Sequence, residues 1–129
     1  MPRILIADDD PSVLLLLEML FIAEGFDVVT ACDGFAALEL AVLELPDVIL
    51  LDVMMPEMDG LVLARELRAR AETDITPIVF VSARADADDV AAGRAAGGRA
   101  YVTKPFDPDE LLAVVRAALP QHDAVLPEG

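Results

Sequence analysis

The sequence predicts an α/β protein in which helices cover both faces of a doubly wound parallel sheet. Five short apolar runs alternate along the 129-residue chain with five segments that carry helical start and stop signals. This alternation favours one parallel sheet with right-handed crossover connections. The runs at 3–7 and 47–51 are almost continuously apolar, as expected of strands that are buried on both faces.

The predicted elements follow one another without an internal repeat. Three aspartates end the first strand, and Pro11 then opens a helix that Gly25 closes. The fourth helix is the weakest, because it is rich in alanine and contains Gly93. The last helix starts with a cap and a first-turn proline at 107–108. We expect strands at 3–7, 26–31, 47–51, 76–81 and 99–103, and helices at 11–24, 35–45, 58–70, 86–96 and 107–119.

Composition narrows the function classes. The formal net charge of −15 argues against nucleic-acid binding by this domain, since phosphate backbones require clustered lysine and arginine. No apolar run reaches the roughly 20 residues of a membrane span, and no signal peptide is recognised, so we expect a cytoplasmic domain.

The domain should occupy 1–120, followed by a tail or linker stub at 121–129. Cys32, the single cysteine, excludes an internal disulfide and is expected to pack at a strand end.

Chemically reactive side chains follow the predicted strands. Asp8 and Asp9 follow the first strand, Asp52 the third, Ser82 the fourth and Lys104, the only lysine, the fifth. In open α/β sheets, ligands bind beyond the carboxyl ends of the strands. Clustered carboxylates repel one another unless one is protonated or a cation intervenes, and all-oxygen ligation suits Mg²⁺. A hydroxyl and an ammonium group suit a phosphoryl group. A helix-capping aspartate or a structural ion-pair network explains this arrangement less well, because all five residues fall at strand ends.

Four motifs occur in order at these strand ends: IADDD at 6–10, LLDVMMPEMDG at 50–60, VSA at 81–83 and YVTKPF at 101–106. Each motif is weak alone, but the ordered set is highly specific. With these motifs the chain resembles, over nearly its full length, the receiver domain of two-component response regulators. The resemblance implies a (βα)5 sandwich with strand order 2-1-3-4-5.

The resemblance also implies a role for each site residue. Asp52 is the expected nucleophile, which accepts a phosphoryl group as an acyl phosphate. Mg²⁺ is expected to be bound by Asp9, Asp52 and the backbone carbonyl of Met54, while Asp8 orients the metal-bound waters. Lys104 is expected to pair with the phosphoryl oxygens, and the Lys104-Pro105 bond is expected to be cis.

A signalling switch, and not an enzyme, is the function that the resemblance implies. Ser82 would move to bond the phosphoryl oxygen and Tyr101 would swing inward, changing the face made by the fourth helix, fifth strand and fifth helix. The phosphodonor would be a sensor histidine kinase or phosphotransfer protein, and an output domain, an output protein or a homodimer would read the state. Arg99-Ala100 replaces an acidic pair common in the family, which weakens the case for the salt-bridged dimer of its winged-helix transcription subfamily.

Two other functions compete with this one. Asp8-x-Asp10 after the first strand is similar to the haloacid-dehalogenase phosphatases, in which Asp8 would be the nucleophile. The second alternative is a receiver-like interaction module that is never phosphorylated, although such modules usually lack an acid or the lysine. Dinucleotide binding is disfavoured, because the turn after the first strand is acidic and not glycine-rich.

The first helix carries more apolar residues than one buried face needs. At 100° per residue, one arc is assigned to the core and the opposite arc, beside Glu18 and flanked by Leu14, is expected to form an exposed apolar patch. We interpret this patch as a face for the phosphodonor or a second copy; cover by the last helix or the tail is the alternative. The predicted core residues are Val13, Leu16, Leu17 and Leu20, and the predicted exposed residues are Leu15, Met19 and Ile22.

Overall fold

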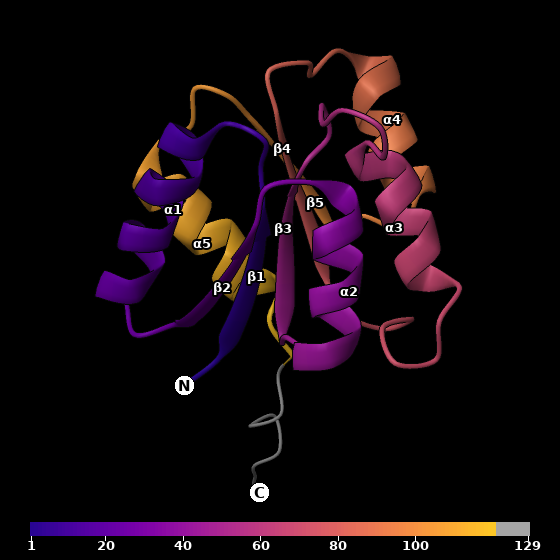
Figure 1. Cartoon of the computed structure of the whole chain (residues 1–129). Coiled ribbons are helices and arrows are strands. Elements are labelled where there is room, and N and C mark those ends of the chain that lie inside the picture. The colour runs from indigo at the N-terminus through magenta and orange to yellow at the C-terminus, as the bar shows by residue number, and fades with distance from the viewer. Residues whose placement is uncertain (121–129) are drawn as a thin grey trace, which may run out of the picture.

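The computed structural model describes residues 1–120, which form a five-stranded parallel sheet between two layers of helices (Figure 1). The strand order β2-β1-β3-β4-β5 confirms the predicted topology. The strands are β1 (Arg3–Ala7), β2 (Asp27–Ala31), β3 (Val48–Asp52), β4 (Ile78–Ser82) and β5 (Ala100–Thr103). The helices are α1 (Pro11–Ala23), α2 (Gly34–Glu44), α3 (Gly60–Arg68), α4 (Ala87–Ala95) and α5 (Pro108–Ala118).

Alternate residues of the central strands face two separate cores. α1 and α5 cover one face of the sheet, while α2, α3 and α4 cover the other (Figure 1). Every residue of β3 and β4 is buried, as predicted for strands covered on both faces. The α1/α5 core includes Ile4, Ile6, Leu50, Val79 and Val81, and the opposite core includes Leu5, Ile49, Leu51, Ile78 and Phe80.

An aspartate caps every helix, and this feature concentrates carboxylates at one edge of the sheet. Each cap side chain accepts a hydrogen bond from a backbone N–H of the first turn, which would otherwise lack a partner. Because each helix follows a parallel strand, all five caps lie near the carboxyl ends of the strands. The caps are Asp10, Asp33, Asp59, Asp86 and Asp107.

The assignment of Leu16 to the core was wrong. Leu16 is 55% exposed, whereas Leu17 and Phe21 are the buried residues of α1. The ring of Phe21 packs edge-on against Phe26, just before β2, with centroids 5.1 Å apart. The side of α1 that faces the sheet is therefore the one that carries Leu17 and Phe21, and Leu16 lies outside it. The exposed patch was confirmed and is larger than predicted: it comprises Leu15, Leu16, Met19 and Ile22.

Two further expectations concern single segments. Cys32 directly follows β2 but is exposed, so the prediction that it packs there was wrong. The strand ends at Ala31, the last buried position before the turn into α2. The predicted tail at 121–129 lies outside the described residues. Within residues 1–120, no helix is both long enough and apolar enough to cross a membrane.

Candidate functional site

The carboxyl ends of four adjacent strands bring the predicted site residues together. Asp8 directly follows β1, Asp52 ends β3, Ser82 ends β4 and Lys104 follows β5. β3 lies between β1 and β4, and β5 pairs with β4, so these ends form one continuous edge. Residues that are as many as 96 positions apart in the sequence therefore meet across this edge.

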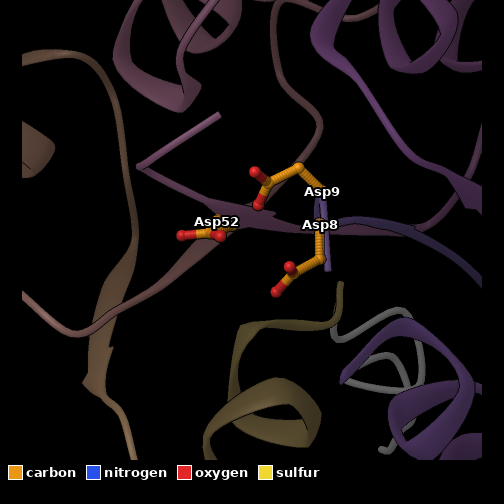
Figure 2. Close-up of side chains that lie close together, drawn as sticks. All are labelled: Asp8, Asp9 and Asp52. Atoms are coloured by element: carbon orange, nitrogen blue, oxygen red, sulfur yellow. The ribbon is translucent and has the colours of Figure 1, made fainter. Parts of the chain in front are cut away.

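Three carboxylates form the centre of the site. Oxygens of Asp8, Asp9 and Asp52 lie within 4.8 Å of one another, and Figure 2 shows the side chains of Asp9 and Asp52 converging. Asp8 is 1% exposed and Asp52 is 6% exposed, whereas Asp9 is open to solvent. Such a buried acidic cluster is electrostatically unfavourable unless cations or hydrogen-bond donors compensate it.

The chain supplies only part of that compensation. One oxygen of Asp8 accepts a hydrogen bond from the Asp10 N–H at 2.9 Å, and one oxygen of Asp52 accepts from the Met54 N–H at 3.1 Å. Within residues 1–120, no protein group donates a hydrogen bond to the Asp9 carboxylate. The cluster therefore presents hard oxygen ligands to solvent, a donor set that fits Mg²⁺.

Lys104 bridges the two buried carboxylates. Its Nζ lies 2.9 Å from Oδ2 of Asp8 and 3.3 Å from Oδ2 of Asp52. Burial alone would lower the pKa of Lys104, but the hydrogen bond to Asp8 and the two nearby negative charges raise it overall. The lysine is therefore an ammonium ion at neutral pH. The Lys104-Pro105 peptide bond is cis, as the family resemblance implied.

Asp52 has a raised pKa, chiefly because burial disfavours its charged form and secondarily because of repulsion from Asp8. The Met54 N–H and Lys104 oppose this shift by stabilising the carboxylate. A perturbed carboxyl group beside an ammonium ion in an acidic cluster is typical of a functional site.

The hydroxyl groups of Ser82 and Tyr101 are connected through one peptide segment. The Arg84 N–H donates to Oγ of Ser82 at 3.1 Å, and the Tyr101 hydroxyl donates to the Arg84 carbonyl oxygen. Both hydroxyl residues were predicted from the sequence, but the backbone of Arg84 between them was missed, because a main-chain contact does not depend on the identity of the side chain.

The loop from β3 to α3 keeps Asp52 in place. The Gly60 N–H donates to the Val53 carbonyl at 2.9 Å, and a Cβ at Gly60 would collide with the carbonyl oxygen of Asp52. Only glycine permits this approach of α3 to the site. In the same loop, Glu57 adopts a φ of 68°, a conformation that non-glycine residues rarely adopt. The structural role of Gly60 was also missed, although the residue lay in a recognised motif.

Sequence comparison identifies relatives over almost the whole chain. The family model of the response regulator receiver domain matches residues 4–116. The DNA-binding response regulator MtrA of Mycolicibacterium smegmatis is 46% identical over 122 residues, which cover 94% of this chain and 52% of MtrA. The DNA-binding dual master transcriptional regulator RpaA of Synechocystis is 41% identical over 125 residues, which cover 97% of this chain and 52% of RpaA. The chain thus spans about half the length of these curated relatives.

Structural comparison gives the same result. The chemotaxis protein CheY4 of Vibrio cholerae superposes with a TM-score of 0.89 at 31% identity, over 92% of this chain and 99% of CheY4. The receiver domain of the sensor histidine kinase PA1611 from Pseudomonas aeruginosa, solved with a magnesium ion coordinated in its active-site cleft, gives a TM-score of 0.84 at 30% identity. That match covers 91% of this chain and 96% of the PA1611 domain. The chain therefore belongs to the response regulator receiver domain family of two-component signalling proteins.

Proposed function

We propose that this receiver domain is a cytoplasmic, phosphorylation-dependent signalling switch in which Asp52 accepts the phosphoryl group. The observation that carries the proposal is the convergence of Asp8, Asp9 and Asp52 with Lys104 at one edge of the sheet. Lys104 lies near both Asp8 and Asp52, and Asp52 is the proposed acceptor because it ends β3 at the position that the receiver-domain motif assigns to the nucleophile. The domain supports its own phosphorylation and dephosphorylation, but it is not an enzyme acting on an external substrate.

The acidic cluster is suited to Mg²⁺. Asp9 and Asp52 are the proposed carboxylate ligands, and the backbone carbonyl oxygen of Met54 is the third proposed ligand. Asp8 would orient metal-bound water. A magnesium ion in the related PA1611 domain supports this assignment. When bound, the cation would offset the negative charge of the carboxylates and of the incoming phosphoryl oxygens.

In the proposed transfer, an oxygen of the Asp52 carboxylate attacks the phosphorus atom of a phosphohistidine. A phosphorus–oxygen bond forms and the phosphorus–nitrogen bond breaks; the imidazole nitrogen leaves with the electron pair and takes a proton from solvent. Lys104, already 3.3 Å from Asp52, is placed to pair with the phosphoryl oxygens. Water later hydrolyses the acyl phosphate and restores Asp52.

The switch would act through Ser82, Arg84 and Tyr101. If the Ser82 hydroxyl turns toward a phosphoryl oxygen, the Arg84 N–H loses its acceptor, and the same peptide segment holds the Tyr101 hydroxyl. Rearrangement of this loop would change the face formed by α4, β5 and α5. α4 is suited to such a change, because Gly93 is its only buried residue.

The proposed partners follow from family membership and the surface. A sensor histidine kinase or phosphotransfer protein would supply the phosphoryl group, and the apolar patch of Leu15, Leu16, Met19 and Ile22 on α1 is the proposed contact. MtrA and RpaA are described as DNA-binding. With a net charge of −15, this domain would act on DNA only through a separate output domain or protein, or through a homodimer that positions one. We propose no membrane contact for this domain.

Phosphorylation mapping tests the proposal. The protein is incubated with phosphoramidate in the presence of Mg²⁺, and intact mass together with borohydride trapping of the acyl phosphate identifies the modified residue. We expect labelling of Asp52, and no labelling in Asp52→Asn or in the presence of EDTA. Asp8→Asn is the companion variant, which would abolish labelling if the phosphatase alternative, with Asp8 as nucleophile, were correct. Labelling at Asp8 would instead indicate the phosphatase alternative, and an unlabelled wild-type protein would indicate the unphosphorylated interaction module.

A further inference from the structure

A second charged site lies at the opposite edge of the sheet. Arg68, Arg94 and Arg99 line a pocket of about 530 Å³ together with Asp74, Ile75, Gly97 and Gly98. Arg68 ends α3, Arg94 lies in the last turn of α4, and Arg99 immediately precedes β5. These positions are at the amino ends of the strands, whereas Asp52 is at a carboxyl end. We call this the arginine pocket.

The arginine pocket is unusual in so acidic a chain. It contains three of the eight arginines, and three guanidinium charges against the single carboxylate of Asp74 leave two positive charges. Four arginines outside the pocket form ion pairs with carboxylates: Arg3, Arg70, Arg84 and Arg116. Arg94 and Arg99 are exposed and form no ion pair with any residue in the described part of the chain.

Arg68 forms the fixed wall of the pocket. Its Nη1 donates to the carbonyl oxygens of Thr73 and Asp74 at 3.1 and 3.2 Å, and its Nη2 donates to the Gly97 carbonyl at 2.9 Å. These bonds leave the Nε–H and one Nη2 hydrogen available. Gly97 has a φ of 100°, and a Cβ there would lie 2.6 Å from Nε of Arg68, so glycine keeps that donor accessible.

The charges in the pocket are not neutralised. The pKa of Arg68 is lowered, first by burial and then by the positive charge of Arg99, while Asp74 opposes the shift. The helix dipole favours cations at the ends of α3 and α4, which accounts for Arg68 and Arg94. It does not account for Arg99, which belongs to neither helix and adds a third positive charge to the other two.

We propose that the arginine pocket binds a dianionic phosphate group, either free in solution or carried as a phosphomonoester. Two uncompensated positive charges match a phosphate dianion better than a single carboxylate. The planar guanidinium groups offer paired N–H donors at the spacing of phosphate oxygens. The lining carries no aromatic side chain, so the pocket recognises the anion and not an attached base or ring.

The binding is tested by amide chemical shifts of the metal-free protein in EDTA. Inorganic phosphate is titrated at constant ionic strength, with acetate and chloride as reference anions. We expect saturable shifts at Gly97, Gly98 and Arg99 with phosphate alone. Arg94→Gln and Arg99→Gln should each weaken phosphate binding by about fivefold or more. Arg65→Gln, an exposed arginine in the last turn of α3 outside the pocket, should change it less than about twofold.

A peptide with one phosphoserine and its unphosphorylated form distinguish the two sources of phosphate. Binding of the phosphopeptide at least about tenfold tighter than inorganic phosphate identifies a phosphorylated polypeptide as the ligand, and equal affinity identifies a free anion. Either result supports the proposal. Shifts that do not saturate, that chloride reproduces, or that persist in the Arg94→Gln/Arg99→Gln double variant would overturn it. Unchanged far-UV circular dichroism of each variant confirms that the fold is retained.

Discussion

Replacing Lys104 by methionine should destabilise the metal-free domain in a pH-dependent way. The variant keeps the length of the side chain but removes the cation that lies 2.9 and 3.3 Å from two buried carboxylates. Removing one partner of a buried ion pair typically costs about 3–5 kcal/mol. Lys104 is 21% exposed and Asp52 can take up a proton, so we expect a smaller loss at neutral pH, about 2–3 kcal/mol. For a domain of this size, that loss lowers the Tm by about 10 °C.

The pH dependence separates electrostatics from simple packing. The pKa of Asp52 is raised above its ordinary value of 3.8, so ionisation of Asp52 lowers the stability of the folded state as pH rises through that pKa. The pKa of Lys104 is also raised, so its stabilising contribution is present below 10.5 and is lost only as pH rises through its folded pKa. As pH rises from 3.8 through the raised pKa of folded Asp52, and well below 10.5, the effect of Lys104→Met should therefore grow with the ionisation of Asp52.

Thermal unfolding in EDTA across this pH range is the assay. The destabilisation should be smallest at the acidic end, because the raised pKa of Asp52 leaves this carboxyl group less ionised there. Adding Asp52→Asn to Lys104→Met should recover part of the lost stability at neutral pH, because one of the two buried charges is then absent while Asp8 stays unpaired. A loss of equal size at every pH, or no recovery in the double variant, would show that Lys104 stabilises the fold by packing and not as a counter-charge.

Two further variants test the apolar patch on α1 and the packing of α4 against Tyr101. Changing Leu15 and Ile22 together to glutamine should weaken phosphotransfer or dimerisation while changing the free energy of unfolding by no more than about 0.5 kcal/mol per site. Leu43→Gln, which changes another exposed apolar residue, is the control. A large loss of Tm with unchanged phosphotransfer and unchanged mass in solution would show that Leu15 and Ile22 belong to the core. A Cβ at Gly93 would lie 2.9 Å from Cδ2 of Tyr101 and 3.2 Å from Cδ2 of Phe80, so Gly93→Ala should displace the tyrosine ring at a cost of about 1–3 kcal/mol. Tyr101 is the only tyrosine and the chain lacks tryptophan, so its fluorescence reports the change directly; an unaltered spectrum would contradict the expected displacement.

The fold and the convergence of the predicted site residues could be predicted because they depend on patterns that the sequence carries locally. Continuous apolar runs identify buried parallel strands, and in a parallel sheet all carboxyl ends lie at one edge. Asp8, Asp52, Ser82 and Lys104 therefore had to lie near one another once their strands were neighbours. The neighbour relation itself came from family resemblance, since the alternation of elements does not determine strand order.

Rotation of α1 could not be predicted with the same certainty. Apolar residues occur on nearly every side of this helix, so periodicity gives almost no preferred direction. The contact of Phe21 with Phe26, which joins α1 to the segment before β2, determines which side is buried. Leu16 was wrongly assigned to the core because a contact between two different segments cannot be inferred from the periodicity of one helix. The same reason explains why the link between Ser82 and Tyr101 through Arg84 was missed.

α4 connects the two proposed sites. Its N-terminal cap, Asp86, lies two residues beyond Arg84, whose backbone forms hydrogen bonds with the hydroxyls of Ser82 and Tyr101, and its last turn carries Arg94 of the arginine pocket. Nine residues of helix span about 13 Å, so a shift or rotation at one end moves the other as a rigid element. Any rearrangement of Ser82 and Tyr101 that displaces α4 must then change the distance from Arg94 to the fixed guanidinium of Arg68. Because linkage between sites is reciprocal, an anion that holds Arg94 and Arg68 together would favour one position of α4 and thereby alter the free energy of the proposed phosphorylation of Asp52.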